Sequence, residues 1–463
     1  MNYIIKYINE IILIKYEKYE KNFFGNSTCN LLDPIRVFNL RLKNGPIEIC
    51  KGENTNHICY INNNSHYNNM LLSKNGVLCT MKNIILDPSK YNKTNLIFKG
   101  YIDKKRKGFP IISKGFFKTK CNYKEITFKY NKIYNDYFNS WDYDYNIENE
   151  IDDLEELAPG KIVFLISRYE DSANLYHGNC EIINSLSMLY LFNLSPEDVQ
   201  VVIYDGMDIP IDPFYDIYKN IISRGGQPIF VKNLKKKYKI SNAINIPINL
   251  DSPPLTFMYF PKCNSIMRTF KLYNDFVDKY MNLTPFKDTY MSDNVTFYYP
   301  DITVKNHKNN IKFKKRLTIQ WRKIWPKERK GQTRLLGNAI ILANTLAQNL
   351  PNDFLVRLID TAPLPYKEQI SIIRSTDYLI GVHGAGLSLS IFLPKNGIMQ
   401  EIGKYKKNNL LCLLSALSGH PTYSDLLNSV AYYDKEKNEY LFFNETEFVK
   451  SVLVHMKENN YDV

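Results

Sequence analysis

The stretch KEQISIIRSTDYLIGVHGAGLSLSIFLPKNGIMQEI, residues 367–402, carries the clearest fold signal of this 463-residue chain. Apolar residues at helical spacing in KEQISIIRST precede the short apolar runs YLIGV and GIMQEI, which predict two strands. A helix is expected in GLSLSIF, so the pattern predicts a parallel α/β sheet. His383, Gly384, Ala385 and Gly386 then follow a strand end, where open α/β sheets bind ligands and backbone N–H groups can approach an anion.

The same alternation extends outward on both sides of a Pro-rich span that includes Pro253, Pro254, Pro261 and Pro285. Before this span, strands are expected in KIVFLIS, VQVVIY and PIFV, with helices in NCEIINSLSMLYLF and IYKNIISRG. After it, strands are expected in RLTIQW and FLVRLI, with a helix over TRLLGNAIILANTLAQNL. Two such α/β segments predict two Rossmann-like domains.

The charge of the chain is strongly basic, with 60 Lys and Arg against 47 Asp and Glu, or +13. This excess permits nucleic-acid, anionic-membrane or phosphate-bearing partners. The lysines are scattered among Asn, Ile and Tyr, as AT-rich coding produces, so nucleic acid is the less favoured partner. Charged residues interrupt residues 1–21, which therefore lack the roughly 18 to 20 apolar residues of a membrane span. They also lack a clean signal peptide, so we expect an anchor outside this chain or a degenerate start.

Cysteine usage indicates an oxidising compartment. Five of the cysteines fall in the first 121 residues without a CxxC pair, which predicts a disulfide-stapled N-terminal segment of open connectivity. The eight are Cys29, Cys50, Cys59, Cys79, Cys121, Cys180, Cys263 and Cys412. Sequons at Asn26, Asn63, Asn92, Asn193, Asn282, Asn294 and Asn444 permit a secretory address. Residues 23–128 are expected to be irregular or β-rich, and 130–160 to be an acidic connector that covers a surface.

The segment 367–402 resembles glycosyltransferase family 61. The resemblance rests on Glu368 and Gln369, on HGAGL from His383 to Leu387, on the FLP of residues 392–394 and on Glu401. It implies an inverting, metal-independent transfer from a UDP-sugar on a fold of two Rossmann-like domains, the GT-B type. The sugar would pass to an acceptor hydroxyl while positive charge stabilises the departing diphosphate.

Arginines of the same resemblance lie upstream. The family pattern has an arginine after a strand, matched here by Arg322. It then has an arginine and an asparagine four residues apart on a helix, matched by Arg334 and Asn338. Because the loop before Arg334 is long, Arg329 is a rival for the second arginine position. Guanidinium groups bind diphosphate oxygens bidentately and stay charged. The nucleotide-sugar-binding residues predicted are Arg322, Arg334, Asn338, His383, Gly384, Ala385, Gly386, Leu387 and Glu401, the last of them toward ribose hydroxyls. In the structural alternative the arginines are solvated loop charges, the glycines allow tight packing and His383 is a satisfied buried histidine.

The catalytic candidates lie in the first α/β segment. ANLYHGNCEIIN, residues 173–184, resembles the corresponding segment of one branch of family 61, the EGF-domain-specific O-linked N-acetylglucosamine transferases. His177 and Glu181 are four apart and share a helix face, so either can be the base that deprotonates the acceptor hydroxyl. Glu181 stands where the branch carries Asp. In the structural alternative the two residues hydrogen-bond each other at the helix start.

A competing metal motif is weak. Asp142, Tyr143 and Asp144 form a DxD, but no apolar strand precedes them, so we expect no metal and no cofactor.

The resulting prediction is an α/β protein of three parts. Residues 1–157 form an irregular Cys-containing N-terminal region with the acidic connector, 158–310 an acceptor-side Rossmann-like domain, and 311–463 a nucleotide-sugar-binding Rossmann-like domain. The predicted activity moves a sugar from a UDP-sugar to a hydroxyl of a protein or glycan in the lumen of the endoplasmic reticulum or Golgi. N-acetylglucosamine is the favoured sugar. The alternatives are a xylosyltransferase acting on polysaccharide, an inactive nucleotide- or glycan-binding relative, and a basic nucleic-acid-binding protein. Donor sugar, acceptor, disulfide pairing and oligomeric state stay open.

Overall fold

The structure is a computed structural model of the whole chain. It describes residues 35, 38–39, 42, 47–60, 78–91, 112–123, 137–144, 151, 153–168, 174–204, 214–224, 226–247, 267–286, 297–298, 313–324, 332–403, 410–461 and 463. The chain divides into two compact units, residues 1–257 (unit 1) and 258–463 (unit 2). None of the described helices is both long and apolar enough to cross a bilayer.

Unit 1 contains the first of the predicted parallel sheets. Neighbouring strands β10, β7, β8 and β9 run parallel, and the predicted strands over 161–167, 199–204 and 228–231 are confirmed. Their bounds are β7 Ile162–Ile166, β8 Val199–Ile203, β9 Ile229–Phe230 and β10 Tyr238–Asn245. The sequence did not predict β10, because polar residues fill half of YKISNAIN and its apolar run is short.

Helix α4 (Leu175–Leu191) connects β7 to β8, as predicted. All of its residues except Leu175, His177 and Tyr190 are buried, including the polar residues Asn179, Glu181, Asn184, Ser185 and Ser187. The predicted helix over 217–225 is instead one short α-turn, α5 (Tyr215–Ile217), followed by the π-turn η5 (Tyr218–Ile222). Short 3-10 turns are η3 (Pro88–Lys90), η4 (Pro196–Asp198) and η6 (Val231–Asn233).

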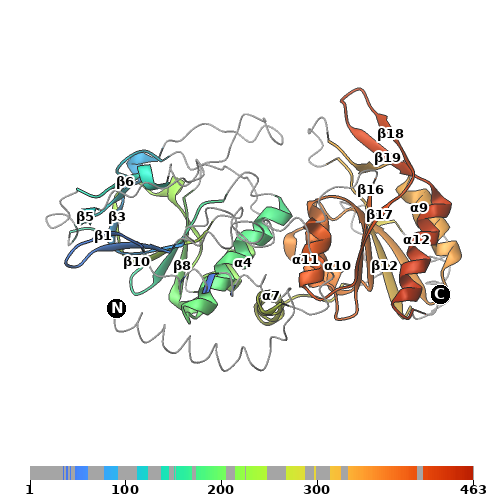
Figure 1. Cartoon of the computed structure of the whole chain (residues 1–463), viewed down its shortest axis with the longest axis horizontal. Helices are drawn as coiled ribbons and strands as arrows, with labels where there is room; N and C mark the ends of the chain where they lie inside the picture. Colours follow the sequence, from blue (N-terminus) through green and yellow to red (C-terminus); the bar gives the residue numbers. More distant parts are fainter. Residues whose placement is uncertain are drawn as a thin grey trace. The chain divides into compact units, whose positions relative to one another are not determined.

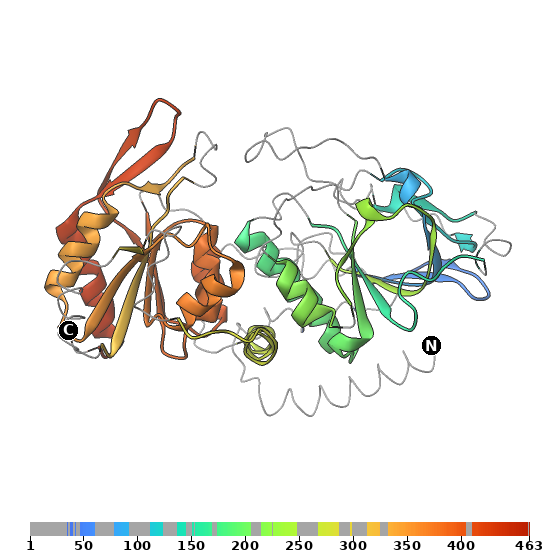
Figure 2. The ribbon, with the colours of Figure 1, turned by 180° about the vertical axis from the view of Figure 1, so that it is seen from behind.

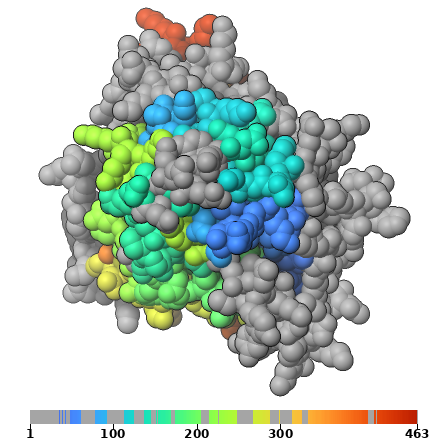
Figure 3. All heavy atoms as spheres, turned by 90° about the vertical axis from the view of Figure 1, so that its left-hand side faces the viewer, coloured from blue at the N-terminus to red at the C-terminus, as the bar shows by residue number. Residues whose placement is uncertain are grey.

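The N-terminal cysteine-containing strands continue the same sheet. β3 pairs antiparallel with β10, β2 with β3 and β1 with β2. In Figure 1, β1 and β3 lie to the left of β8. Their bounds are β1 Ile47–Lys51, β2 Asn56–Tyr60, β3 Leu78–Leu86, β4 Phe117–Lys118, β5 Asn122–Tyr123 and β6 Trp141–Asp142. In the space-filling view these blue and cyan segments gather on one face of the molecule (Figure 3).

Disulfides join Cys50 to Cys121 and Cys59 to Cys79, as expected of an N-terminal stapled segment. Cys59 and Cys79 lie directly opposite each other in the β2–β3 register. Cys180 and Cys412 are buried thiols, and Cys29 and Cys263 lie outside the described residues. Nothing in the local sequence distinguishes these pairs from others, because pairing follows from the sheet register.

The acidic connector contributes to the core as well as to the surface. Its strand β6 pairs with β4, and Tyr137 and Trp141 are almost fully buried. Trp141 stacks on Phe117 with ring centroids 5.0 Å apart. The interpretation as a surface cover therefore missed two buried aromatic residues, which lie among other aromatic, acidic and polar residues and form no apolar run.

Unit 2 contains a second parallel sheet in the order β11-β14-β12-β15-β16-β17, in which only β11 is antiparallel to its neighbour among the described strands. The predicted strands over 316–321, 354–359, YLIGV and GIMQEI are confirmed. Their bounds are β11 Phe297–Tyr298, β12 Lys315–Gln320, β14 Phe354–Ile359, β15 Tyr378–Val382, β16 Ile398–Gly403 and β17 Thr422–Leu426.

Helices cover both faces of this sheet. α9 (Ala339–Asn349) and α12 (Glu445–Glu458) lie on one face, and α10 (Tyr366–Arg374) and α11 (Leu410–Leu417) lie on the other, as Figures 1 and 2 show from opposite sides. α7 (Arg268–Tyr280) and the 3-10 helix η8 (Ala385–Phe392) complete the unit. The sequence FNETEFVKSVLVHMKEN, residues 443–459, predicts a closing helix with Asn444 or Thr446 as its N-cap. The N-cap is Asn444, whose side chain accepts from Glu447 N at 3.0 Å.

A small ribbon of strands stands apart from this sheet. β13 (Leu335–Leu336), β19 (Glu439–Phe443) and β18 (Ser429–Tyr433) form it in that order, with β18 and β19 as a projecting hairpin (Figure 1). The predicted helix over 333–350 is wrong in its first turn, because Leu335 and Leu336 pair with β19 and the helix begins only at Ala339. Arg334 and Asn338 therefore do not share a helix.

Candidate functional site

Three predicted donor-site residues converge at one edge of the unit 2 sheet. Arg322 follows the end of β12, His383 follows β15 directly, and Glu401 lies on β16, paired in register with Gly381. Since these strands are parallel neighbours, their carboxyl ends meet at the same edge, which is where open α/β sheets place ligands. The resemblance to family 61 predicted these residues as one set, and the structure brings them together.

The three residues are in direct contact. Arg322 Nη1 donates to the His383 carbonyl at 2.9 Å, and His383 Nδ1 lies 2.6 Å from Glu401 Oε1. The Glu401 side chain is 7% exposed and that of His383 is 22% exposed. A carboxylate can only accept, so Nδ1 carries the proton in neutral His383 and Nε2 is the acceptor. The imidazole is thus oriented by a buried carboxylate.

Cys412 completes the surroundings of this carboxylate. Its Sγ donates to Glu401 Oε2 at 3.6 Å and is buried. Burial, with the Glu401 charge second, raises the pKa of the Cys412 thiol far above its usual range. The thiol is therefore protonated at neutral pH and unsuited to nucleophilic chemistry.

The glycines of HGAGL make room for protein side chains. A Cβ at Gly384 would overlap Arg322 Nη1, and a Cβ at Gly386 would overlap the Gln320 amide. Leu387 is fully buried and turns back under β15, where a Cβ at Gly381 would lie 2.8 Å from Leu387 Cδ2. The close packing foreseen by the structural alternative is thus present, with Arg322 itself as the packed group. Diphosphate binding by this turn stays a prediction.

The Arg334 segment sits beside these residues without forming the predicted helical turn. Asn338 is the residue before α9, and its amide is used by β19: Nδ2 donates to Phe443 O at 2.8 Å, and Oδ1 accepts from Phe443 N at 3.1 Å. Asn338 is 7% exposed, which indicates a structural role. Leu336 N donates to Arg322 O at 3.1 Å, so the two arginine-bearing segments are joined. Arg329 lies outside the described residues.

The electrostatics of this edge are mixed. Burial lowers the pKa of Arg334, while the carboxylates of Glu401 and then Glu439 raise it; an arginine still stays charged. Burial lowers the pKa of Lys323, whose Nζ lies 3.7 Å from the centre of the Trp321 ring. Burial also raises the pKa of Asp360, which directly follows β14. Cationic groups therefore stand beside buried carboxylates at this edge.

Sequence reasoning missed several residues of this edge. Gln320 ends β12, and its Nε2 donates to Thr361 Oγ1 at 2.9 Å, while Asp360 follows the neighbouring strand β14. Both stand at strand ends and could have been selected by that criterion. Glu439 lies more than 100 residues from Arg334 in the chain, and no local signal connects them.

The predicted catalytic pair lies in unit 1, at the start of α4. His177 is half-buried and Glu181 is 1% exposed, and Tyr218 Oη donates to Glu181 Oε2 at 3.5 Å. Both follow β7, at the carboxyl edge of the unit 1 sheet. A Cβ at Gly178 would overlap the Phe214 ring, so this turn is tightly packed. His177 is the more accessible of the two, and the role of either as a base stays a prediction.

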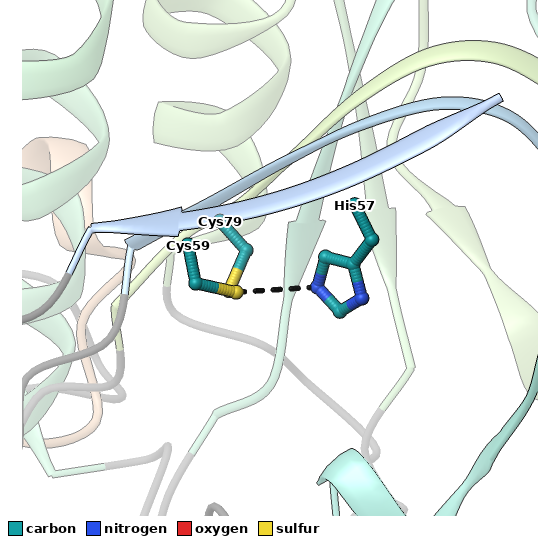
Figure 4. A group of neighbouring side chains, drawn as sticks. All are labelled: His57, Cys59 and Cys79. Atoms are coloured by element: carbon teal, nitrogen blue, oxygen red, sulfur yellow. Dashed lines mark hydrogen bonds between the residues drawn. A yellow bond between two sulfur atoms is a disulfide. The ribbon is translucent and has the colours of Figure 1, made fainter. Parts of the chain in front are cut away.

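Possible metal ligands in the described parts of the chain are limited to one group, His57, Cys59 and Cys79. Figure 4 shows that the two cysteines form the disulfide, with His57 Nε2 3.3 Å from Cys59 Sγ. Disulfide sulfurs do not offer the thiolates that bind zinc. Burial lowers the pKa of His57 to about 3, and its ring stacks on Trp141 at 4.2 Å. This group is a core cluster.

The central residue of the DxD motif, Tyr143, belongs to that core cluster. Tyr143 Oη lies 3.2 Å from His57 Nδ1, and its ring stacks on Trp141. Asp142 belongs to β6, and its Oδ1 accepts from Asp144 N at 3.3 Å.

Comparison with known proteins finds a match to one family over part of the chain. The sequence profile described as Glycosyltransferase 61 matches residues 218–399. Over these residues the chain is similar to glycosyltransferase family 61. The match includes Arg322, Arg334, Asn338 and His383–Leu387, and it ends just before Glu401.

A curated protein is also similar to the chain. The chain is 23% identical over 265 residues to the EGF domain-specific O-linked N-acetylglucosamine transferase of Drosophila melanogaster. This alignment covers 55% of the chain and 43% of the relative. The chain therefore matches less than half of that protein's length.

Proposed function

We propose that this chain is an inverting glycosyltransferase of family 61 that moves N-acetylglucosamine from UDP-N-acetylglucosamine to a hydroxyl of a secretory-pathway protein or glycan. The observation that carries the proposal is the cluster of Arg322, His383 and Glu401 at the carboxyl edge of a parallel sheet. A fixed guanidinium and an oriented imidazole at that edge suit a nucleotide diphosphate.

In this proposal each group has a distinct part. Arg322, with Arg334 beside it, neutralises the charge that grows on the departing UDP. Glu401 fixes the His383 ring, whose Nε2 faces the nucleotide; contact between Glu401 and ribose hydroxyls is the second expected use of this carboxylate. His177 or Glu181 takes the acceptor proton, on a fold of the GT-B type. No metal takes part.

The sugar, the acceptor and the compartment are proposed on separate grounds. The sugar and a protein hydroxyl come from the name of the Drosophila relative. The secretory-pathway lumen is supported by the disulfides Cys50–Cys121 and Cys59–Cys79, because such bonds persist in oxidising compartments. In this proposal, the excess of basic residues reflects surface lysines and the phosphate site, and nucleic acid is not the partner.

Thermal unfolding with and without UDP tests the donor site. UDP at 100 times its Kd should stabilise the wild-type protein by about 2.7 kcal/mol, and Arg322→Ala should abolish this protection. Arg316→Ala is the matched control, since Arg316 lies near the amino end of β12, the strand that Arg322 follows. Absence of any UDP-dependent shift in the wild type contradicts the proposal, as does protection that survives Arg322→Ala.

A panel of UDP-sugars offered with a folded EGF domain tests the activity. Transfer from UDP-N-acetylglucosamine is expected, whereas selective use of UDP-xylose would identify the polysaccharide xylosyltransferase alternative. UDP binding without hydrolysis or transfer from any donor would identify an inactive relative. Binding to nucleic acid that falls steeply with salt and is indifferent to Arg322→Ala would point to the basic-protein alternative.

A further inference from the structure

Arg334 has an unusual backbone conformation. Its φ is 63°, in the left-handed region, which is uncommon for a residue that has a Cβ and lacks the short polar side chain of Asn or Asp. Among the described residues, the other non-glycine positions of this kind are mostly asparagines: Asn83, Asn193, Asn282 and Asn460, with Lys437. A turn needing only this backbone would be served by asparagine or glycine. An arginine here indicates that its side chain is used.

The hairpin β18–β19 holds this conformation in place. Arg334 N donates to Glu439 Oε2 at 3.2 Å, and Glu439 N donates to Gln332 O at 2.7 Å. Gln332 N donates to Asn438 Oδ1 at 2.9 Å, and Asn438 is fully buried. We call these four residues, Gln332, Arg334, Asn438 and Glu439, the clasp. It fixes the backbone on both sides of Thr333 and so overdetermines a strained residue.

The Arg334 side chain lies within electrostatic reach of the candidate donor site, and its Nε lies 3.4 Å from Thr333 Oγ1. Glu401, the carboxylate that orients His383, is the stronger of the two charges acting on Arg334, ahead of Glu439. The same segment is joined to Arg322, because Leu336 N donates to Arg322 O. Glu439 is 6% exposed, and its other oxygen accepts from Tyr433 Oη at 3.2 Å, so it is itself held rigidly.

We propose that Glu439 is a positioning residue that holds Arg334 in the left-handed conformation and thereby aims its guanidinium at the diphosphate of a nucleotide sugar. The inference rests on the proposed function in that Arg334 is taken to bind the UDP diphosphate. Glu439 does not touch the nucleotide and acts through Arg334.

A double-mutant cycle of Glu439→Ala and Arg334→Gly in the full chain tests the proposal with two readouts. Glycine adopts the left-handed backbone without help, and it also removes the guanidinium. In thermal unfolding, Glu439→Ala should therefore destabilise the wild-type protein more than it destabilises the Arg334→Gly protein. Equal losses in the two backgrounds would show that Glu439 does not hold Arg334 and would overturn the proposal.

The second readout is the Kd for UDP, measured by calorimetry. Glu439→Ala should weaken UDP about tenfold in the Arg334 protein, since small displacements of a binding group cost this much or more. It should change the Kd by less than about twofold in the Arg334→Gly protein, where no guanidinium remains to be aimed. Similar weakening in both backgrounds would mean that Glu439 acts on UDP directly or through general unfolding, which overturns the proposal.

Two further variants separate positioning from hairpin stability. Glu439→Gln keeps an oxygen that can accept from Arg334 N and should recover most of the UDP affinity. Glu447→Ala removes another carboxylate near the hairpin base, which accepts from Asn428 N at 3.0 Å, and should lower the unfolding temperature while leaving the Kd unchanged. If Glu447→Ala weakens UDP as much as Glu439→Ala, hairpin destabilisation explains the effect and the proposal fails.

The two proposals fail in different ways. If the wild-type protein binds no UDP, the proposed function is contradicted, and the stability cycle still decides whether Glu439 holds Arg334. If the wild type binds UDP and Arg322→Ala abolishes binding while the Glu439–Arg334 cycle shows no coupling, only the positioning role is lost.

Discussion

At the residue scale, the glycines of HGAGL matter because they have no side chain. Gly384 and Gly386 lack the Cβ atoms that would displace Arg322 and Gln320, so both side chains reach the end of β15. The φ of Gly384 is 176°, an extended value open to any residue, so the requirement at this position is space. His383 contacts both neighbours: its carbonyl accepts from the Arg322 guanidinium, and its ring is hydrogen-bonded to Glu401.

Gly384→Ala should therefore disable the donor site without a change in backbone conformation. The new methyl group displaces the Arg322 guanidinium, and UDP protection against thermal unfolding should fall to that of Arg322→Ala. Gly160→Ala is a useful control, since it lies in unit 1 with φ 70° and open space around its Cβ; it should lose stability and keep UDP protection. Normal protection in Gly384→Ala would contradict this account.

At the element scale, local signals succeed where the contacts are local. Helix α12 begins where the sequence predicts, because Asn444 caps it from within the same turn. Helix α9 begins later than predicted, because β19 pairs with Leu335 and Leu336 and also occupies the amide of Asn338. A helical pattern in the sequence cannot report a strand that arrives from more than 100 residues away.

The cap of α12 gives a direct test of this element. Asn444→Ala should lower the free energy of unfolding by about 1 kcal/mol, because Glu447 N loses its acceptor. Asn444→Asp keeps the cap and should be close to neutral. Thr446→Ala removes the sequon but not the cap, so comparison in glycosylating and non-glycosylating hosts separates a glycan effect from the cap effect. Equal stability of Asn444→Ala and wild type in urea unfolding would refute the capping role.

At the scale of the whole molecule, the described strands of unit 1 join two parts of the sequence that look unrelated. The antiparallel strands β1 to β3 and the parallel strands β7 to β9 meet through β10 in one sheet. The disulfides Cys50–Cys121 and Cys59–Cys79 fasten the antiparallel part, whereas the candidate donor site belongs to unit 2. Stability of the first part and donor binding should therefore respond to different changes.

Loss of the long-range disulfide tests this separation. Cys50→Ser with Cys121→Ser removes a bridge between residues 71 apart and should cost unit 1 about 2–5 kcal/mol. In calorimetry, the double variant should unfold at a lower temperature than the wild type. Adding reductant should lower that temperature less in the double variant than in the wild type. UDP protection of unit 2 should persist, and its loss in the double variant would show that the two units do not respond separately.

The sequence by itself determined what depends on neighbouring residues: the alternation of strands and helices, the cap at Asn444, and the places where polar side chains follow strand ends. The strand ends singled out His383, and the resemblance to family 61 added Arg322 and Glu401. Tertiary structure alone decided the disulfide pairs, the β10–β3 pairing, the Glu401 contact with His383 and the hold of Glu439 on Arg334. These contacts join residues far apart in the chain, so their free energy depends on the three-dimensional register of strands and has no counterpart in local periodicity.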